Sequence, residues 1–298
     1  MKNLTLGFLG LILILNFACT NQTDQTDEIE TIVTGLAKVP NDWVESRVAE
    51  AKAKLEATEA GKIVWNAMEA HGGLANWYAN GPLSFRFNYQ PLDGSTPRDT
   101  YESVDTWRNR TRHQDAADAA AEYGFDGTNF WQLTQDSAHF AYNIRFWSLT
   151  PYYFLAQPFV LDGSGVNLEK LPQKNYKDQL YDVVKVTFEA GTGDAPDDYY
   201  VLYFNVDNSQ LKVIRYIVSY PGYFEKGQHL PEKFMELYGS QTINGFLFPE
   251  SYQTHWLTDA EEPGEYITKI DVSDLKFEPD LKDDYFSMPV GAILLKDL

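Results

Sequence analysis

The chain is poor in the residues that build the commonest reactive centres. Its 298 residues include one cysteine, Cys19, and five widely spaced histidines. The spacings typical of zinc sites are therefore absent, and so are glycine-rich phosphate loops and the Gly-x-Ser-x-Gly turn of serine hydrolases. From these patterns we predict no metal site, no cofactor and no catalytic residue.

Positive charge is also scarce. Lysine and arginine together number 24, against 43 aspartates and glutamates, which gives a formal net charge of −19. Such a chain repels the phosphate backbone of nucleic acids, so we exclude nucleic acid as a partner. The same charge repels anionic membrane surfaces, and we expect the folded part to stand off from a bilayer.

The single cysteine ends a segment typical of secretion signals. Lys2 precedes a largely apolar run that ends at Leu15, and Ala18 stands immediately before Cys19. A basic start, a short apolar run and a small residue before the cut describe a signal peptide, and the run is shorter than the ~20 residues of a transmembrane helix. With cysteine next, the segment resembles the lipobox at which signal peptidase II cleaves bacterial lipoproteins, although Asn16 stands where that motif prefers leucine.

This resemblance implies where the protein is held. Residues 1–18 would be removed as a lipoprotein signal peptide, and Cys19 would carry acyl chains, each methylene contributing ~0.8 kcal/mol of anchoring. Thr20 replaces the aspartate of the inner-membrane retention signal. We therefore expect an outer-membrane lipid anchor and leave open whether the protein faces the periplasm or the cell surface. The polar, acidic residues 19–40 predict a disordered tether, and residues 41–298 a single domain.

The rest of the sequence changes from helical to alternating periodicity. Apolar residues three or four apart predict helices over 43–55 and 59–70, with Thr58 as a cap and Gly72 with Gly73 as the stop. Alternation predicts strands over 83–89, 100–107, 129–134, 183–188, 199–206, 211–219, 246–255 and 266–272. Residues 138–161, rich in aromatics and interrupted by Pro151, predict short helices. This order predicts an α+β fold, a curled antiparallel sheet with an N-terminal helix and a helical insertion across its concave face.

Several stretches resemble outer-membrane lipoproteins with a LolA-like fold. They are Ala70-His71-Gly72-Gly73-Leu74 with Trp77, the turn Phe125-Asp126-Gly127 leading to Trp131, and the segments 156–161, 203–206 and 211–216. The resemblance extends from Gly61 to the C-terminus. It implies a half-barrel of antiparallel strands around helices, with a concave apolar surface that holds acyl chains in studied relatives. It supplies no catalytic residue, and a shared fold does not establish a shared ligand.

Aromatic side chains are more numerous than an ordinary core needs. The candidates for ligand binding are Trp107, Trp131, Phe146, Trp147, Tyr152, Tyr153 and Phe154. They either fill the core of a large sheet or line a ligand cavity, because such cavities are mostly apolar. The insertion over 138–161 is correspondingly either a plug in the concave face or a lid above it.

Three hypotheses for function follow. The first is a lipoprotein without enzymatic activity that binds a hydrophobic small molecule or a lipidated protein in the half-barrel. The second is a glycan-binding surface lipoprotein in polysaccharide uptake, since exposed aromatic rings stack on sugars. The third is a carboxylate-based hydrolase, whose pair of acidic residues cannot be chosen from sequence. A metal at His113 with Glu102 or Asp105 is a weaker idea, because a solvated turn explains the residues around His113.

Cys19 provides the first test. Since no other thiol can accept a lipid, the substitution Cys19→Ser should give a soluble or uncleaved product. Membrane fractionation and mass spectrometry of the N-terminus check this. A Cys19→Ser protein that is still processed, acylated and associated with the outer membrane would contradict the lipobox interpretation.

Overall fold

The N-terminal helices follow the predicted apolar spacing. In the computed structural model, which describes residues 35–296, they are α2 (Asn41–Glu56), α3 (Glu59–Ala70) and α4 (Leu74–Ala79). The Thr58 hydroxyl accepts a hydrogen bond from the backbone N–H of Gly61 at 3.0 Å and caps α3. Gly72 and Gly73 end α3 with φ values of 126° and 86°, which a residue with a side chain rarely adopts. The predicted signal peptide, Cys19 and most of the predicted tether lie outside the described residues.

The folded part begins earlier than the predicted boundary at residue 41. Ala37 and Val39 are only 1% and 3% exposed. The backbone N–H of Ala37 donates to the carbonyl of Leu281 at 2.8 Å, which ties this segment to the C-terminal part of the chain. The reason is local: these apolar residues follow the acidic stretch and pair with the segment that follows β14, at Leu281 and Lys282.

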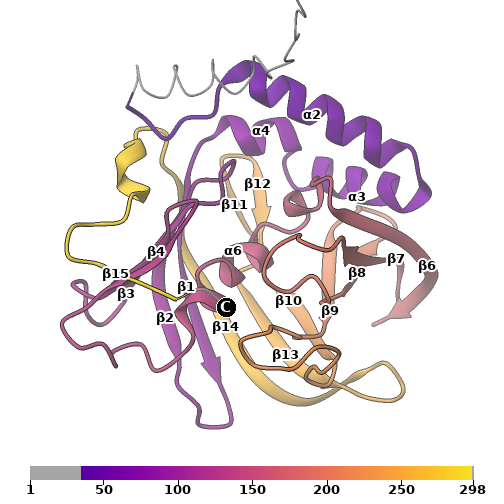
Figure 1. Cartoon of the computed structure of the whole chain (residues 1–298). Helices are drawn as coiled ribbons and strands as arrows, with labels where there is room; N and C mark the ends of the chain where they lie inside the picture. The colour runs from indigo at the N-terminus through magenta and orange to yellow at the C-terminus, as the bar shows by residue number, and fades with distance from the viewer. Residues whose placement is uncertain (1–34, 297–298) are drawn as a thin grey trace, which may run out of the picture.

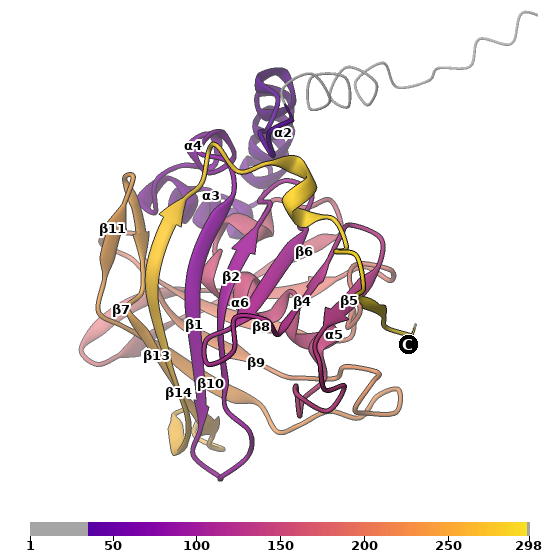
Figure 2. The same ribbon diagram turned by 90° about the vertical axis from the view of Figure 1, so that its left-hand side faces the viewer.

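A single antiparallel sheet of 13 strands dominates the structure (Figures 1 and 2). Its order is β15-β5-β4-β3-β2-β1-β14-β13-β10-β9-β8-β7-β6, so β15 and β6 are open edges and the sheet does not close. The strands are β1 (Leu83–Pro91), β2 (Arg98–Val104), β3 (Thr111–Asp115), β4 (Glu122–Phe125), β5 (Phe130–Leu133), β6 (Val166–Tyr176), β7 (Gln179–Phe188), β8 (Tyr200–Asn205), β9 (Leu211–Tyr216), β10 (Lys233–Tyr238), β13 (Ser251–Leu257), β14 (Pro263–Phe277) and β15 (Ile293–Leu294). A small hairpin, β11 (Gln241–Ile243) with β12 (Phe246–Phe248), stands beside it.

The sheet curls into a half-barrel, which confirms the predicted α+β class. Figure 1 shows the strands curving around the interior, with α2, α3 and α4 at one end. Register shifts along β14, against both β1 and β13, place irregularities in the longest strand, and such irregularities bend a sheet.

Strands β6 and β10 were not predicted from alternation, and the structure shows why. Strand β6 is an edge whose residues are mostly exposed, so it needs little apolar alternation. In β10, the neighbours Phe234 and Met235 are both fully buried. This is possible because a second apolar cluster, containing Tyr203 and Phe234, lies on the convex face of the same strands. A strand buried on both faces loses its alternation.

The aromatic insertion lies across the concave face as predicted, and it is a plug. It comprises α5 (Ile144–Trp147), α6 (Thr150–Leu155) and the short 3₁₀ helix η1 (Phe159–Leu161). Trp147 is 6% exposed and Phe159 only 2%. The ring of Phe159 stacks on that of Trp77 from α4, with centroids 4.5 Å apart and planes inclined by 9°. The plug therefore belongs to the main core. No helix among residues 35–296 has the length and apolar character needed to cross a bilayer.

The stacked pair Trp77 and Phe159 tests this description. Phe159→Ala should destabilise the protein by about 3–5 kcal/mol, because it removes a large buried side chain from a close-packed site. Leu92→Ala is the control, since Leu92 is 52% exposed and surface substitutions cost within ~0.5 kcal/mol. Denaturant unfolding measures both. Equal stability of the two variants would show that the insertion is a loosely held lid.

Candidate functional site

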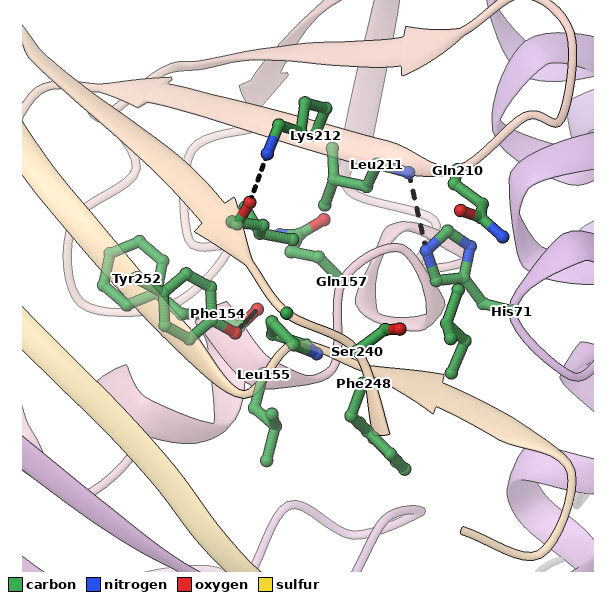
Figure 3. Close-up of a pocket in the computed structure, with 14 residues that line it drawn as sticks. His71, Phe154, Leu155, Gln157, Gln210, Leu211, Lys212, Ser240, Phe248 and Tyr252 are labelled. Atoms are coloured by element: carbon green, nitrogen blue, oxygen red, sulfur yellow. Dashed lines mark hydrogen bonds between the residues drawn. The ribbon is translucent and has the colours of Figure 1, made fainter. Parts of the chain in front are cut away.

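The plug leaves part of the concave side unfilled. A cavity of about 240 Å³ remains between the end of α3, the plug and strands β9, β10, β12 and β13 (Figure 3). Apolar side chains form part of its wall, and the polar residues His71, Gln157, Gln210, Lys212 and Ser240 also line it; the apolar ones are Phe154, Leu155, Leu211, Leu237, Leu247, Phe248, Pro249 and Tyr252. Pockets for drug-sized ligands hold roughly 300–1,000 Å³. This cavity therefore fits one small apolar group or part of one acyl chain, and not a whole lipid with several chains.

His71 forms one end of the cavity (Figure 3). Its Nδ1 lies 2.7 Å from the carbonyl oxygen of Ala67 and donates to it, which leaves Nε2 to accept. The backbone N–H of Leu211 points at that Nε2 at 3.5 Å. Burial lowers the pKa of His71, so the ring is neutral at pH 7. His71 joins α3 to β9 and adds no charge to the cavity.

Gln157 is a buried amide in the cavity wall. The residue is 5% exposed, and neither its Oε1 nor its Nε2 has a partner with hydrogen-bond geometry. The Tyr153 hydroxyl lies near it: burial raises the pKa of Tyr153, and the Gln157 amide offsets part of that rise. A buried polar group left unpaired costs about 1–3 kcal/mol. A ligand that offers it a hydrogen bond in the cavity would remove this cost.

The structure brings together five of the seven predicted aromatic residues in the plug and places two elsewhere. Phe154 lines the cavity, and Tyr153 packs against Tyr200 with ring centroids 5.0 Å apart. Phe146, Trp147 and Tyr152 lie in the plug outside the cavity lining.

The other two predicted residues lie apart from the plug. Trp107 contacts Trp43 of α2, with ring centroids 5.4 Å apart. Trp131 is fully buried beside the Arg112 guanidinium, on the opposite face of the sheet from the plug. A role in ligand binding remains a prediction for all seven residues.

Sequence reasoning did not find most of the cavity. Its walls come from α3, the plug, three strands of the large sheet and the small hairpin, which only the fold brings together. One signal was present. Gln157 is a lone amide in the otherwise apolar run from Leu155 to Leu161, and such a residue in a core segment needs a polar partner.

A second polar group lies beneath the plug. Glu102 of β2 and His113 of β3 are cross-strand partners, 1% and 0% exposed, with Oε1 and Nε2 3.7 Å apart. His113 Nε2 donates to the carbonyl oxygen of Ser148 at 2.9 Å and so ties the plug to the sheet. Burial lowers the pKa of His113 to about 4 and raises that of Glu102 well above its usual value. Both side chains are therefore held in their neutral forms.

The geometry does not support a metal site at His113. Glu102 does face His113 across the strands, but no third ligand joins them. Within residues 35–296, no group of three or more histidine, aspartate or glutamate side chains is placed to hold a metal ion.

Comparison with known proteins establishes the fold alone. No protein-family model matches the sequence, and no curated protein is similar enough to count as a relative. Among solved structures, a LolA superfamily protein from Nitrosomonas europaea is similar with a TM-score of 0.50, at 12% identity over 78% of this chain and 98% of that one. A DUF1329 family protein from Desulfovibrio piger gives a TM-score of 0.47 at 14% identity, over 82% of this chain and 97% of that one. The fold of this chain is LolA-like, as the sequence motifs predicted.

Glu102 generates a pH-dependent prediction. A carboxyl whose pKa is raised by folding binds its proton more tightly in the folded state, so stability falls as pH rises above the ordinary value of 4.5. Glu102→Gln replaces the titratable carboxyl with a neutral amide. The variant should therefore melt at a higher temperature than the parent at pH 8, but not at pH 4. Glu265→Gln, at an exposed position, is the control. A Glu102→Gln protein that loses stability at pH 8 would mean that Glu102 is ionised and paired.

Proposed function

We propose that this chain is a lipid-anchored protein of the bacterial envelope, held at the outer membrane through Cys19, that binds an apolar ligand in its half-barrel. The ligand is a hydrophobic small molecule or one acyl chain of a lipidated partner. The observation that carries the proposal is the cavity between plug and strands, which has leucine and phenylalanine side chains and the buried Gln157 amide in its wall. The LolA-like fold and the lipobox-like segment ending at Cys19 support the same setting.

The cavity walls explain why an apolar ligand fits best. Leucine and phenylalanine side chains are the largest apolar part of the lining, and apolar burial contributes about 25 cal/mol per Å². Gln157 adds one place for a hydrogen bond, such as a carboxyl, ester or amide group provides. A wall that combines apolar side chains with a few polar groups is the usual design of a small-molecule site.

The alternative functions find less support in the same geometry. Stacking on sugars requires exposed aromatic rings, and the large exposed side chains of residues 35–296 include only Tyr101 and Tyr223 as aromatics. A hydrolase of the carboxylate type requires two acidic groups at the substrate, and no carboxylate lines the cavity. Asp105, one of the buried acids, is held by Arg110 at 2.6 Å.

A cavity-filling variant tests the proposal. Leu247 is half-buried in the cavity wall, so Leu247→Trp should occupy the space and weaken binding of a fluorescent fatty acid at least tenfold. Leu180→Trp, at a position 40% exposed and outside the cavity, should bind like the parent. Fluorescence titration measures affinity, and the melting temperature of each variant confirms that it is folded.

Two results would contradict the proposal. One is unchanged fatty-acid binding by a folded Leu247→Trp protein. The other is saturable binding of an oligosaccharide by a parent protein that binds no fatty acid, which would favour the glycan-binding function.

A further inference from the structure

Arg98 differs from every other arginine of residues 35–296. The others all form ion pairs with carboxylates: Arg47 with Asp162, Arg86 with Asp99, Arg108 with Asp283, Arg110 with Asp105, Arg112 with Glu122, Arg145 with Asp194 and Arg215 with Glu232. Within the described part of the chain Arg98 has no such partner, although acidic residues outnumber basic ones by 43 to 24. The surroundings of Arg98 therefore require an explanation.

Aromatic rings surround Arg98 in place of a carboxylate. Its guanidinium carbon lies 5.0 Å from the ring centroid of Tyr89, 5.4 Å from that of Tyr142 and 4.7 Å from that of Trp147. Nε is buried with no hydrogen-bond partner. Rings attract a cation but accept no conventional hydrogen bond, so the guanidinium keeps its donors available.

A second unpaired cation lies near it. Lys233 of β10 has its Nζ 5.6 Å from the ring centroid of Tyr216 and 5.5 Å from that of Trp256, and it forms no ion pair within residues 35–296. Burial and the positive charge of Arg98 lower the pKa of Lys233 to about 8, and the exposed Asp93 offsets this only in part. Asp93 also interacts electrostatically with Arg98, but it forms an ion pair with neither cation within residues 35–296. Two cations that raise each other's energy, with no carboxylate in direct contact, are suited to binding an anion.

Both residues face the concave side at one end of the half-barrel. Each lies two positions before a buried residue on the same strand, Thr100 in β2 and Met235 in β10, and residues two positions apart point to the same face. Arg98 is the first residue of β2, and Lys233 is the first residue of β10. Leu237, in the cavity wall, is four positions from Lys233 on the same strand, or about 13 Å at ~3.3 Å per residue. The cation pair is therefore separate from the cavity.

We propose that Arg98 and Lys233 form a binding site for the anionic group, carboxylate or phosphate, of a small amphiphile. The guanidinium supplies a fork of donors to two oxygens, and the Lys233 ammonium adds a third contact. The apolar part of the ligand packs on the ring of Trp256, which is half-buried and lies next to Lys233. This site does not depend on the cavity and would operate whether or not the cavity is occupied.

Short amphiphiles test the site on the full chain in a non-ionic detergent. Trp147 and Trp256 flank the cations, so tryptophan fluorescence should report binding of hexanoate, hexyl phosphate or both, and hexanol at the same concentration should have no effect. Inorganic phosphate separates the sources: if it competes, phosphate is the preferred group, and if only hexanoate binds, the site is one for carboxylates.

Substitutions then assign the binding to the cations. Arg98→Gln and Lys233→Gln should each weaken anion binding about tenfold or more. Arg86→Gln, which removes a paired arginine on the neighbouring strand, should leave it unchanged. If Arg98→Gln does not fold, Arg98→Lys decides, because it keeps the charge and loses the fork and should still weaken binding. Equal binding of hexanol, no binding of either anion, or unchanged anion affinity in folded Arg98 and Lys233 variants would each overturn the proposal.

Discussion

The structure depends on covering the concave face of a wide, open sheet. An open sheet of 13 strands presents a large apolar surface on its inner side, and the N-terminal helices lie at one end of it. The plug covers the remainder: Trp147, Phe154, Phe159 and Leu161 are all buried against the sheet or the helices. Burying a large apolar side chain contributes about 1.5–3 kcal/mol, so the plug stabilises the half-barrel rather than resting on it.

Polar contacts fix the plug in one position. The His113 imidazole donates to the carbonyl of Ser148, and the Tyr252 hydroxyl donates to the carbonyl of Phe154 at 3.3 Å. These bonds hold the turns of the plug at the sheet, and the space between them and β9, β10 and β12 is the cavity. Gln157, between α6 and η1 in the plug, is left without a partner there. A plug that leaves a buried amide facing a cavity has the features of a binding site.

The sequence predicted the fold class and the curled antiparallel sheet well because they depend on periodicity, but it did not predict the strand order, in which β1 pairs with β14. Thr58, Gly72 and Gly73 bound a helix where the pattern placed one, and alternation predicted β1, β8 and β9. Strand β10 was missed because Phe234 and Met235 are buried on opposite faces, which removes the alternating signal. The site was harder still. Trp131 and Phe154 are both aromatic residues in aromatic-rich segments, so the sequence does not tell them apart. Trp131 lies on the convex side and Phe154 lines the cavity, because strand register and sheet curvature decide which face a residue occupies.

The central claim is that the cavity beside Gln157 takes an apolar chain. A crystal structure with a fatty acid brominated at its chain end tests it most directly, because the bromine scatters anomalously and marks where the chain lies. The account predicts an anomalous peak among Leu155, Leu247 and Phe248, with Gln157 bonded to the ligand's polar group or to a water beside it. A fully occupied fatty acid bound elsewhere, with the cavity unchanged, would contradict it.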